Sequence, residues 1–274
     1  MKLNYQRLTL LPVAVRATIF LVTLLLLWLP LAAPLYLLLR SDSNLATIVT
    51  MSLMFVVFLV LLPWWGKLVY QQPRIYRYYG LSWSQANRLA WHRGLTIGVL
   101  FTFIFFVFQS ILGWVEFQSS AASLPRLVIE GFFSGVGIAF AEELFFRGWL
   151  LDELQRDYTA TTAMWLNGVV FAFLHFLKPL PEMLQNLPAF PGLIMLGITL
   201  VWAKHQAKGQ LGLPMGIHGG LVWSYYILSI GGFFNYTNKV PLWVSGGVGG
   251  NPLAGLMGLG GLFLLVIAVR LSNE

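Results

Sequence analysis

Long apolar segments without charge constrain this chain more than any other feature of its sequence. Residues 17–39 contain no charged side chain, and residues 46–66 form a second segment of the same kind. A helix needs about 20 apolar residues to cross a bilayer, so each segment is long enough to span one. The chain is 58% hydrophobic and only 10% charged, against about 25% charged in a typical soluble protein. The sequence therefore predicts an integral membrane protein.

Further segments of this kind complete the predicted topology. We expect an all-α, polytopic membrane helix bundle with eight transmembrane helices. The predicted spans cover residues 17–39, 46–66, 94–115, 124–156, 158–177, 190–204, 213–230 and 252–270. With the N-terminus inside, most Lys and Arg residues fall in cytoplasmic loops, as the positive-inside rule favours. The expected orientation is therefore N-in/C-in.

The spans suggest three consecutive regions. Residues 1–123 form an N-terminal three-helix membrane region with a basic cytoplasmic loop, in which residues 81–93 are interpreted as an amphipathic helix lying on the membrane. Residues 124–230 form the expected catalytic helix core, and residues 231–274 add an interfacial loop and a final transmembrane helix. The basic residues lie between apolar segments, so they indicate contact with membrane lipids and no binding of nucleic acid. The lack of cysteine excludes disulfides and thiolate metal ligands.

Ionisable side chains inside the membrane are concentrated in the second half of the chain. The first three predicted spans carry none, whereas the later spans contain Glu142, Glu143, Arg147, His175 and His218. Such groups are costly at bilayer depth and usually mark a functional site. We therefore expect the second half to hold the site and the first half to act mainly as scaffold.

Glu142 and His175 are predicted to face each other on two antiparallel spans. They lie at similar distances on either side of the turn near residues 157–159, which places them at the same depth. His218 shares this depth only if the turn projects beyond the membrane, so the site would lie toward the cytoplasmic half. The residues expected to project into water are Asp152, Glu153, Arg156 and Asp157.

The residue types indicate how this site would work. Glu143 and Arg147 form an i,i+4 pair in the favourable orientation, so Arg147 is predicted to neutralise Glu143 and to fix the helix face. Glu142 points to another face, where together with His175 it could activate a water molecule. His218 could then donate to a developing oxyanion. As an alternative, the acidic pair and Arg147 form an ion-pair network that only locks helices together.

Two other patterns can each be interpreted in two ways. Asn167 lies on the same helix face as His175, where it either lines the site or hydrogen-bonds between helices. Small residues spaced by four, Gly131/Gly135 and Gly216/Gly220, indicate either close helix packing or ordinary glycine usage in membrane helices.

Three motifs of this core resemble the CPBP family of intramembrane proteases. They are AEELFFRGWL at 141–150, FAFLHF at 171–176 and LPMGIHGG at 213–220. The family includes the CAAX prenyl endopeptidases and proteins linked to bacteriocin processing and immunity. The resemblance covers roughly residues 124–230, where the order of motifs and spans also agrees.

The resemblance implies a role for each matching residue. Glu142 and His175 would activate the attacking water, and His218 would help to hold the oxyanion. Glu143 completes the predicted catalytic set. Structural support is assigned to Arg147, Asn167 and Phe171.

One position departs from the family pattern. The third motif commonly has Asn four residues after its histidine, whereas this chain has Val222 there. The side chains that could substitute for the missing amide are those of Ser224, Tyr225 and Asn167.

Metal dependence is left open by the sequence. The family is often described as metalloproteases, which would make Glu142, His175 and His218 the ligands of a catalytic zinc ion with one open position. The chain lacks the H-E-x-x-H motif of helical zinc sites, and the same three residues also suit a metal-free, glutamate-driven hydrolysis.

The predicted function is that of an intramembrane endopeptidase acting on a membrane-associated protein or peptide. The prenyl branch of the family would imply a lipidated substrate. The alternative is a non-catalytic scaffold or immunity protein that binds a partner through the same polar cavity. A proton-coupled transporter would need inverted repeats, which the sequence does not show.

Overall fold

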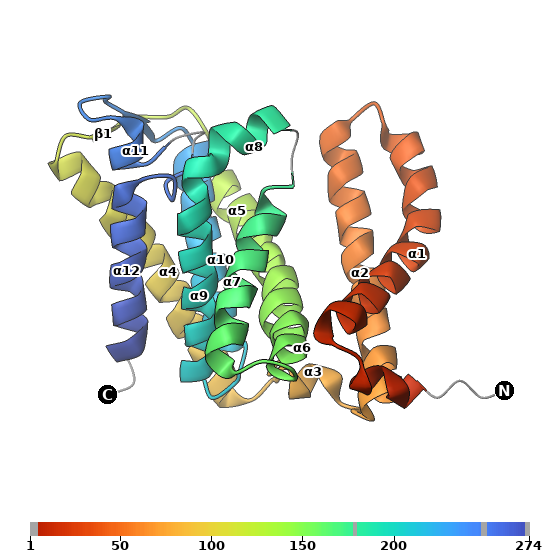
Figure 1. Cartoon of the computed structure of the whole chain (residues 1–274). Helices are drawn as coiled ribbons and strands as arrows, with labels where there is room; N and C mark the ends of the chain where they lie inside the picture. The colour runs from red at the N-terminus through yellow and green to blue at the C-terminus, as the bar shows by residue number, and fades with distance from the viewer. Residues whose placement is uncertain (1–4, 178–179, 248–250, 272–274) are drawn as a thin grey trace. The chain divides into compact units, whose positions relative to one another are not determined.

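The computed structural model describes residues 5–177, 180–247 and 251–271, and its regular structure is helical apart from one short ribbon of two strands (Figure 1). The all-α prediction is thus confirmed in general. Contacts divide the chain into two compact units. The first contains Met1–Tyr78 and Glu153–Asp157, and the second contains Tyr79–Asp152 and Tyr158–Glu274. The three regions expected from the sequence stay a prediction.

Among the described residues, five helical segments are long and apolar enough to cross a membrane, so the chain is an integral membrane protein. They are Val13–Leu39, Ser43–Tyr70, Gln85–Ile111, Leu124–Gln155 and Leu180–Gln206. Shorter apolar helices cover Ala160–His175 and Leu256–Arg270. The predicted count of eight spans and the N-in/C-in orientation stay predictions.

The first unit is built on a pair of long helices. α1 (Val13–Leu39) and α2 (Ser43–Tyr70) pack against each other, with η1 (Tyr5–Leu10) before them and α3 (Ile75–Tyr78) after them. Asp42 accepts a hydrogen bond from the amide of Leu45 at 2.9 Å and so caps the start of α2.

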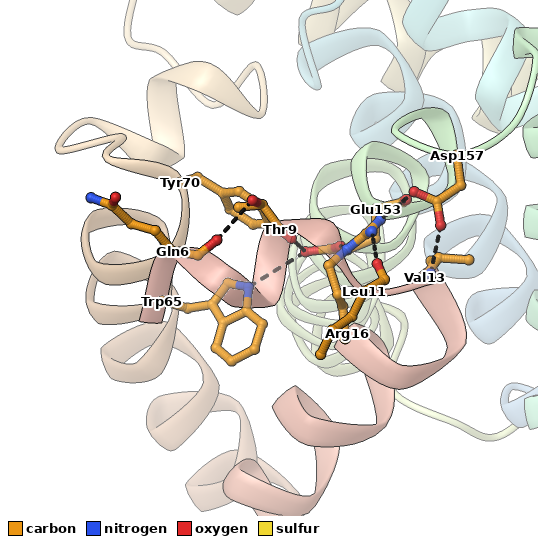
Figure 2. Close-up of polar contacts among 9 residues, drawn as sticks. All are labelled: Gln6, Thr9, Leu11, Val13, Arg16, Trp65, Tyr70, Glu153 and Asp157. Carbon is orange, nitrogen blue, oxygen red and sulfur yellow. Dashed lines mark hydrogen bonds and ion pairs between the residues drawn. The ribbon is translucent and has the colours of Figure 1, made fainter. Parts of the chain in front are cut away.

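A cluster of ion pairs ties this unit together around Arg16 (Figure 2). The guanidinium of Arg16 contacts a carboxylate oxygen of Glu153 and one of Asp157, each at 2.9 Å. The Tyr70 hydroxyl donates to Glu153 at 2.5 Å, and the amide of Val13 donates to Asp157 at 2.6 Å. Arg16 and Glu153 are both buried, so each charge depends on the other.

The prediction that this turn reaches into water is wrong for Glu153, which is fully buried. The reason is Arg16, which supplies the opposite charge from a distant part of the sequence. Asp157 keeps 27% of its side chain exposed. Burial raises the pKa of Asp157, but hydrogen bonds from Arg16 and Val13 outweigh this and hold the pKa below its usual value. This contact therefore stabilises the fold at pH values above the usual pKa of an aspartate. The stabilisation is lost as the pH falls through the lowered pKa of Asp157.

The second unit holds the remaining helices, several of which run side by side in Figure 1. Its first part contains α4 (Gln85–Ile111), α5 (Leu124–Glu143), the π-helix η2 (Leu144–Leu150), α6 (Leu151–Gln155) and α7 (Ala160–His175). α6 crosses the boundary between the units. Its second part contains α8 (Leu180–Asn186), η3 (Leu187–Ala189), α9 (Phe190–Gln206), α10 (Gly212–Ile230), α11 (Leu242–Ser245) and α12 (Leu256–Leu271).

α10 is the centre of this unit because its glycines allow close backbone contact. A Cβ atom at Gly216 would overlap the carbonyl oxygen of Trp91, and one at Gly220 would overlap that of Leu95, both on α4. On the other side, Gly135 of α5 lies against the backbone of Gly219. Small residues let membrane helices approach in this way. The close-packing interpretation of the spaced glycines is therefore confirmed.

The start of α10 is also fixed by a side chain. The Asn87 side-chain oxygen accepts a hydrogen bond from the amide of Gly212 at 2.7 Å. The Asn87 amide group donates to the carbonyl of Ser82, also at 2.7 Å. Asn87 thereby satisfies one of the free amides at a helix N-terminus.

The expected surface helix over residues 81–93 is a second wrong prediction. Helix α4 begins at Gln85 and continues without a break to Ile111, with Ser84 as its N-cap. Residues 85–93 are therefore the first turns of a spanning helix, and Gly94 continues the helix because it packs against α10.

The predicted interfacial loop is partly ordered by pairing. β1 (Val115–Phe117) forms an antiparallel ribbon with β2 (Phe234–Tyr236), with Val115 opposite Tyr236. The loop also contains α11, while its residues 248–250 lie outside the described part of the chain.

Filling the contact between α10 and α4 should destabilise the protein. We expect Gly216→Ala to lower the free energy of unfolding by about 1–3 kcal/mol, because the methyl group must push the helices apart. Gly137→Ala is the matched control, since nothing lies within 4 Å of a Cβ atom there. Thermal unfolding of the two purified variants in detergent tests this, and equal midpoints would contradict it.

Removing Arg16 should leave Glu153 as an unpaired buried charge. We expect Arg16→Met to cost about 3–5 kcal/mol of stability. Arg126→Met removes an exposed pair with Glu130, whose loss should leave stability almost unchanged because solvent screens the two charges. Denaturation of both variants in the same detergent gives the comparison. An Arg16→Met variant as stable as Arg126→Met would show that the buried cluster contributes nothing.

Candidate active site

The candidate site begins where α5 ends. Glu142 and Glu143 are the last two residues of α5, and the π-helix η2 follows at once with Arg147 in its middle. The sequence predicted an ordinary helix here. A π-helical turn carries an extra residue and is frequent at functional sites. Even so, Arg147 contacts Glu143 at 2.9 Å, as the i,i+4 spacing predicted.

Two neighbouring helices bind the backbone of this π-helix. The Asn167 amide on α7 donates to the carbonyl of Phe146 at 2.8 Å. The Lys204 ammonium on α9 donates to the carbonyl of Arg147 at 2.6 Å. Asn167 therefore takes the second of its two predicted roles, a hydrogen bond between helices. Lys204 was not identified from the sequence, where a single lysine near a helix end carries no distinctive signal.

Arg147, Glu143 and His218 form a buried charged cluster. Glu143 and Arg147 are fully buried, and His218 is 5% exposed. One oxygen of Glu143 lies 2.9 Å from Arg147 and 2.8 Å from Nδ1 of His218. Arg147 also donates to the carbonyl of Gly197 at 3.0 Å, and its guanidinium stacks 4.4 Å from the centre of the Phe171 ring. The cluster joins the end of α5, the middle of η2, α9 and α10.

Both histidines turn the same ring nitrogen toward Glu142. Nδ1 of His175 lies 2.7 Å from the carbonyl of Phe171, and a carbonyl only accepts hydrogen bonds, so Nδ1 carries a proton. Nδ1 of His218 likewise donates to the carboxylate of Glu143. In each neutral ring, Nε2 then holds the free lone pair. These two atoms lie 3.5 Å (His175) and 3.9 Å (His218) from the same oxygen of Glu142.

That oxygen of Glu142 is the chemical centre of the arrangement. Oε2 is buried and has no hydrogen-bond partner within the described residues. The rest of the side chain is 28% exposed, and that of His175 is 31% exposed. The side chains of Glu142 and His175 are therefore accessible to a reactant, whereas those of Glu143 and Arg147 are buried.

The structure thus brings together the residues singled out by the sequence. Glu142 comes from α5, His175 from α7 and His218 from α10. Phe171 is buried and supports His175 through its carbonyl, with ring centres 4.3 Å apart.

The three residues suggested to replace the missing amide all have partners within the protein, in the case of Tyr225 a side-chain hydrogen bond with Ser229. Asn167 binds the carbonyl of Phe146, and the Ser224 hydroxyl donates to the carbonyl of Gly220 in its own helix at 2.6 Å. Tyr225 and Val222 line a cavity together with His218.

The sequence left open a metal ion held by the residues that meet at Glu142. Within the described residues, no group of three or more His, Asp or Glu side chains is arranged to hold one. The assignment of Glu142, His175 and His218 as zinc ligands stays a prediction. The chemistry proposed below is derived from the protein's own groups.

Comparison with known proteins gives one match. Residues 124–224 match the model of a family described as type II CAAX prenyl endopeptidase Rce1-like. This segment is Rce1-like, and the match confirms the resemblance to the CPBP family. It covers less than half of the chain, but it contains all the residues that meet at Glu142. No curated protein and no solved structure matches the chain.

The Arg147 side chain in this Rce1-like segment should not be replaceable by lysine. An ammonium group lacks the planar fork that reaches Glu143 and the carbonyl of Gly197 together. We expect Arg147→Lys to destabilise the protein by about 1–3 kcal/mol, because one buried partner loses its hydrogen bond. Arg126→Lys, at an exposed pair, should leave stability almost unchanged. Equal unfolding midpoints for the two variants would show that the guanidinium of Arg147 does not stabilise the protein through its two contacts.

Proposed function

We propose that the protein is an intramembrane endopeptidase that hydrolyses a peptide bond in a membrane-associated protein or peptide. The observation that carries this proposal is the meeting of Glu142, His175 and His218, from three helices, at one carboxylate oxygen of Glu142, whose side chain is partly exposed. The Rce1-like match supports peptidase chemistry for the segment that holds them. The substrate class is a protein or peptide, and a lipid-modified one would follow the name of the matching family.

In the proposed mechanism, Glu142 is the general base. Its carboxylate takes a proton from water while the water oxygen bonds to the carbonyl carbon of the substrate. Nε2 of His175 lies 3.5 Å away, close enough to orient the same water and to share the proton. The carbonyl π electrons move onto oxygen, which gives a tetrahedral oxyanion.

His218 is assigned to that oxyanion. A protonated His218 ring donates from Nε2, since its Nδ1–H is already held by Glu143. Glu143 does not reach the reacting atoms in this scheme, so it is a positioning residue that orients His218 and stabilises its positive charge. Arg147 balances the buried charge of Glu143.

The second step restores the enzyme. The oxyanion collapses, the carbon–nitrogen bond breaks, and the leaving amine takes the proton that Glu142 received from water. The products are a new carboxyl terminus and a new amino terminus, and the second proton of the water passes from the carboxyl group to the amine. We place this site toward the cytoplasmic half of the membrane, on the depth argument from the sequence.

Replacing the base should abolish turnover without removing binding. Glu142→Gln keeps the size of the side chain but cannot accept a proton, so we expect kcat to fall by about 10²–10⁴-fold. Glu130→Gln is the control, because Glu130 is an exposed partner of Arg126. The measurement is cleavage of a peptide library by purified protein in liposomes. Unchanged turnover in Glu142→Gln would exclude the proposal.

The same assay separates the remaining alternatives. A chelator that removes activity would favour a metal-dependent reaction, whereas activity insensitive to chelator favours hydrolysis by glutamate alone. If neither the unmodified protein nor Glu142→Gln cleaves any peptide, the scaffold reading gains weight. In that case, partner binding should survive the substitution, because the side chain keeps its shape.

A further inference from the structure

A cavity of about 540 Å³ lies between α4, α5 and α10, beside the first turns of α4. Its walls include Trp91 of α4, Phe140 of α5 and Met215 of α10. Phe140 lies two residues before Glu142, and Met215 lies three residues before His218. The cavity is therefore bounded by the two helices that carry these proposed catalytic side chains, although the proposed mechanism makes no use of it.

The length of α4 places its first turns at the depth of the lipid headgroups. The helix has 27 residues and is therefore about 40 Å long, whereas the hydrocarbon core of a bilayer is about 30 Å thick. One end must extend beyond this core even at the average tilt of about 20°. Arg88 and Arg93 lie near the start of the helix, and residues 94–111 carry no charge. Since charged side chains avoid the hydrocarbon, the extending end is the start of α4.

Arg88 supplies a positive charge at the edge of this cavity. Its side chain is exposed and forms no ion pair within the described part of the chain. No Asp or Glu lines the cavity, and residues 67–93 contain none. His92 lies one turn after Arg88 and also lines the edge. Because an arginine side chain can donate two parallel hydrogen bonds to a phosphate, this edge is complementary to a phosphate group.

The interior of the cavity is apolar. Val136 and Phe140 line it from α5, and Met215 lines it from α10. Two tryptophans lie on the side of α4, Trp91 within the helix and Trp83 just before it, with Trp83 92% exposed. Indole rings are enriched where hydrocarbon meets headgroups. The cavity thus combines walls suited to a hydrocarbon chain with an edge suited to a charged headgroup.

The polar side chains further inside are bound to the protein itself. The Ser82 hydroxyl donates to the side-chain oxygen of Gln210 at 2.7 Å. Asn87 accepts from the amide of Gly212 and donates to the carbonyl of Ser82, each at 2.7 Å. An anion without an apolar part would therefore lose its water inside the cavity without gaining new partners there.

We propose that this cavity binds an anionic glycerophospholipid, with the phosphate at Arg88 and one acyl chain against Val136 and Phe140. The lipid would contact α4, α5 and α10 together and so stabilise the helices that carry Glu142 and His218. The lipid is neither cut nor consumed, so this site does not rest on the proposed peptidase function.

The test is native mass spectrometry of the full-length protein in a mild detergent, with one lipid added at a time. The probe is palmitoyl-oleoyl phosphatidylglycerol, and its matched comparison is phosphatidylcholine with the same chains and no net charge. We expect phosphatidylglycerol to bind about tenfold more tightly, the factor contributed by one charge-assisted hydrogen bond. Glycerol 3-phosphate tests the polar part alone, and palmitoyl-oleoyl glycerol tests the chains alone. Each should bind at least about tenfold more weakly than phosphatidylglycerol, because it fills only one part of the site.

Four variants locate the lipid. Arg88→Gln should reduce the preference for phosphatidylglycerol to about twofold or less, because the phosphate loses its cation. Arg126→Gln removes an exposed charge that does not line the cavity, so the preference should stay. Val136→Trp should fill the interior and weaken both phospholipids by about tenfold. Ile138→Trp is its control, because Ile138 is 42% exposed and does not line the cavity. Arg88 is exposed, so its variant keeps the test decisive if Val136→Trp does not fold.

Several results would overturn the lipid site. They are equal affinity for the two phospholipids in the unmodified protein, an unchanged preference in Arg88→Gln, and an equal loss of preference in Arg126→Gln. Binding of glycerol 3-phosphate as tight as that of the intact lipid would show a phosphate site instead, and equally tight binding of palmitoyl-oleoyl glycerol would show an apolar groove without headgroup recognition. Equal weakening by Ile138→Trp and Val136→Trp would place the lipid elsewhere. Failure of the peptidase function would appear separately, as no difference in cleavage between the unmodified protein and Glu142→Gln.

Discussion

The close contact of α10 with α4 and α5 is the constraint on which the rest of the second unit depends. Gly216 and Gly220 have no side chains, so the backbone of α10 lies directly on that of α4. This contact fixes the position of α10 along α4, and the hydrogen bond from Gly212 to Asn87 fixes the first turn of α10. His218 lies between the two glycines, so its ring is placed by the same packing. A single methyl group at this contact would therefore act on stability and on the site together.

The buried charges of the second unit form the next layer of support. Glu143 is shared by Arg147 and His218, and Arg147 extends the network to α9 through Gly197. Charges buried in this way are stable only as a complete set, since the loss of one partner leaves the other unpaired. The π-helix carries Arg147, and the carbonyls of Phe146 and Arg147 within it accept hydrogen bonds from Asn167 and Lys204. The position of Glu142 thus depends on groups that do not contact the substrate in the proposed mechanism.

Much of this arrangement could be predicted from residues near one another in the sequence. The spacing of Glu143 and Arg147, and the equal distances of Glu142 and His175 from one turn, were sufficient to place four side chains. Contacts set by distant residues were not predictable. Arg16 and Glu153 are 137 residues apart, and nothing in either segment indicates that a charged turn residue is buried. The π-helix was also missed, because nothing in residues 144–150 distinguishes them from an ordinary α-helical sequence.

In the proposed mechanism, Glu142 and His175 act together on one water molecule. A double-mutant cycle measures this directly, with kcat/KM determined for Glu142→Gln, His175→Asn and the double variant. Residues that act as a unit give strongly non-additive losses. We expect the double variant to be about as inactive as the more impaired single variant. If the two losses instead multiply, the residues act independently and the shared site is contradicted.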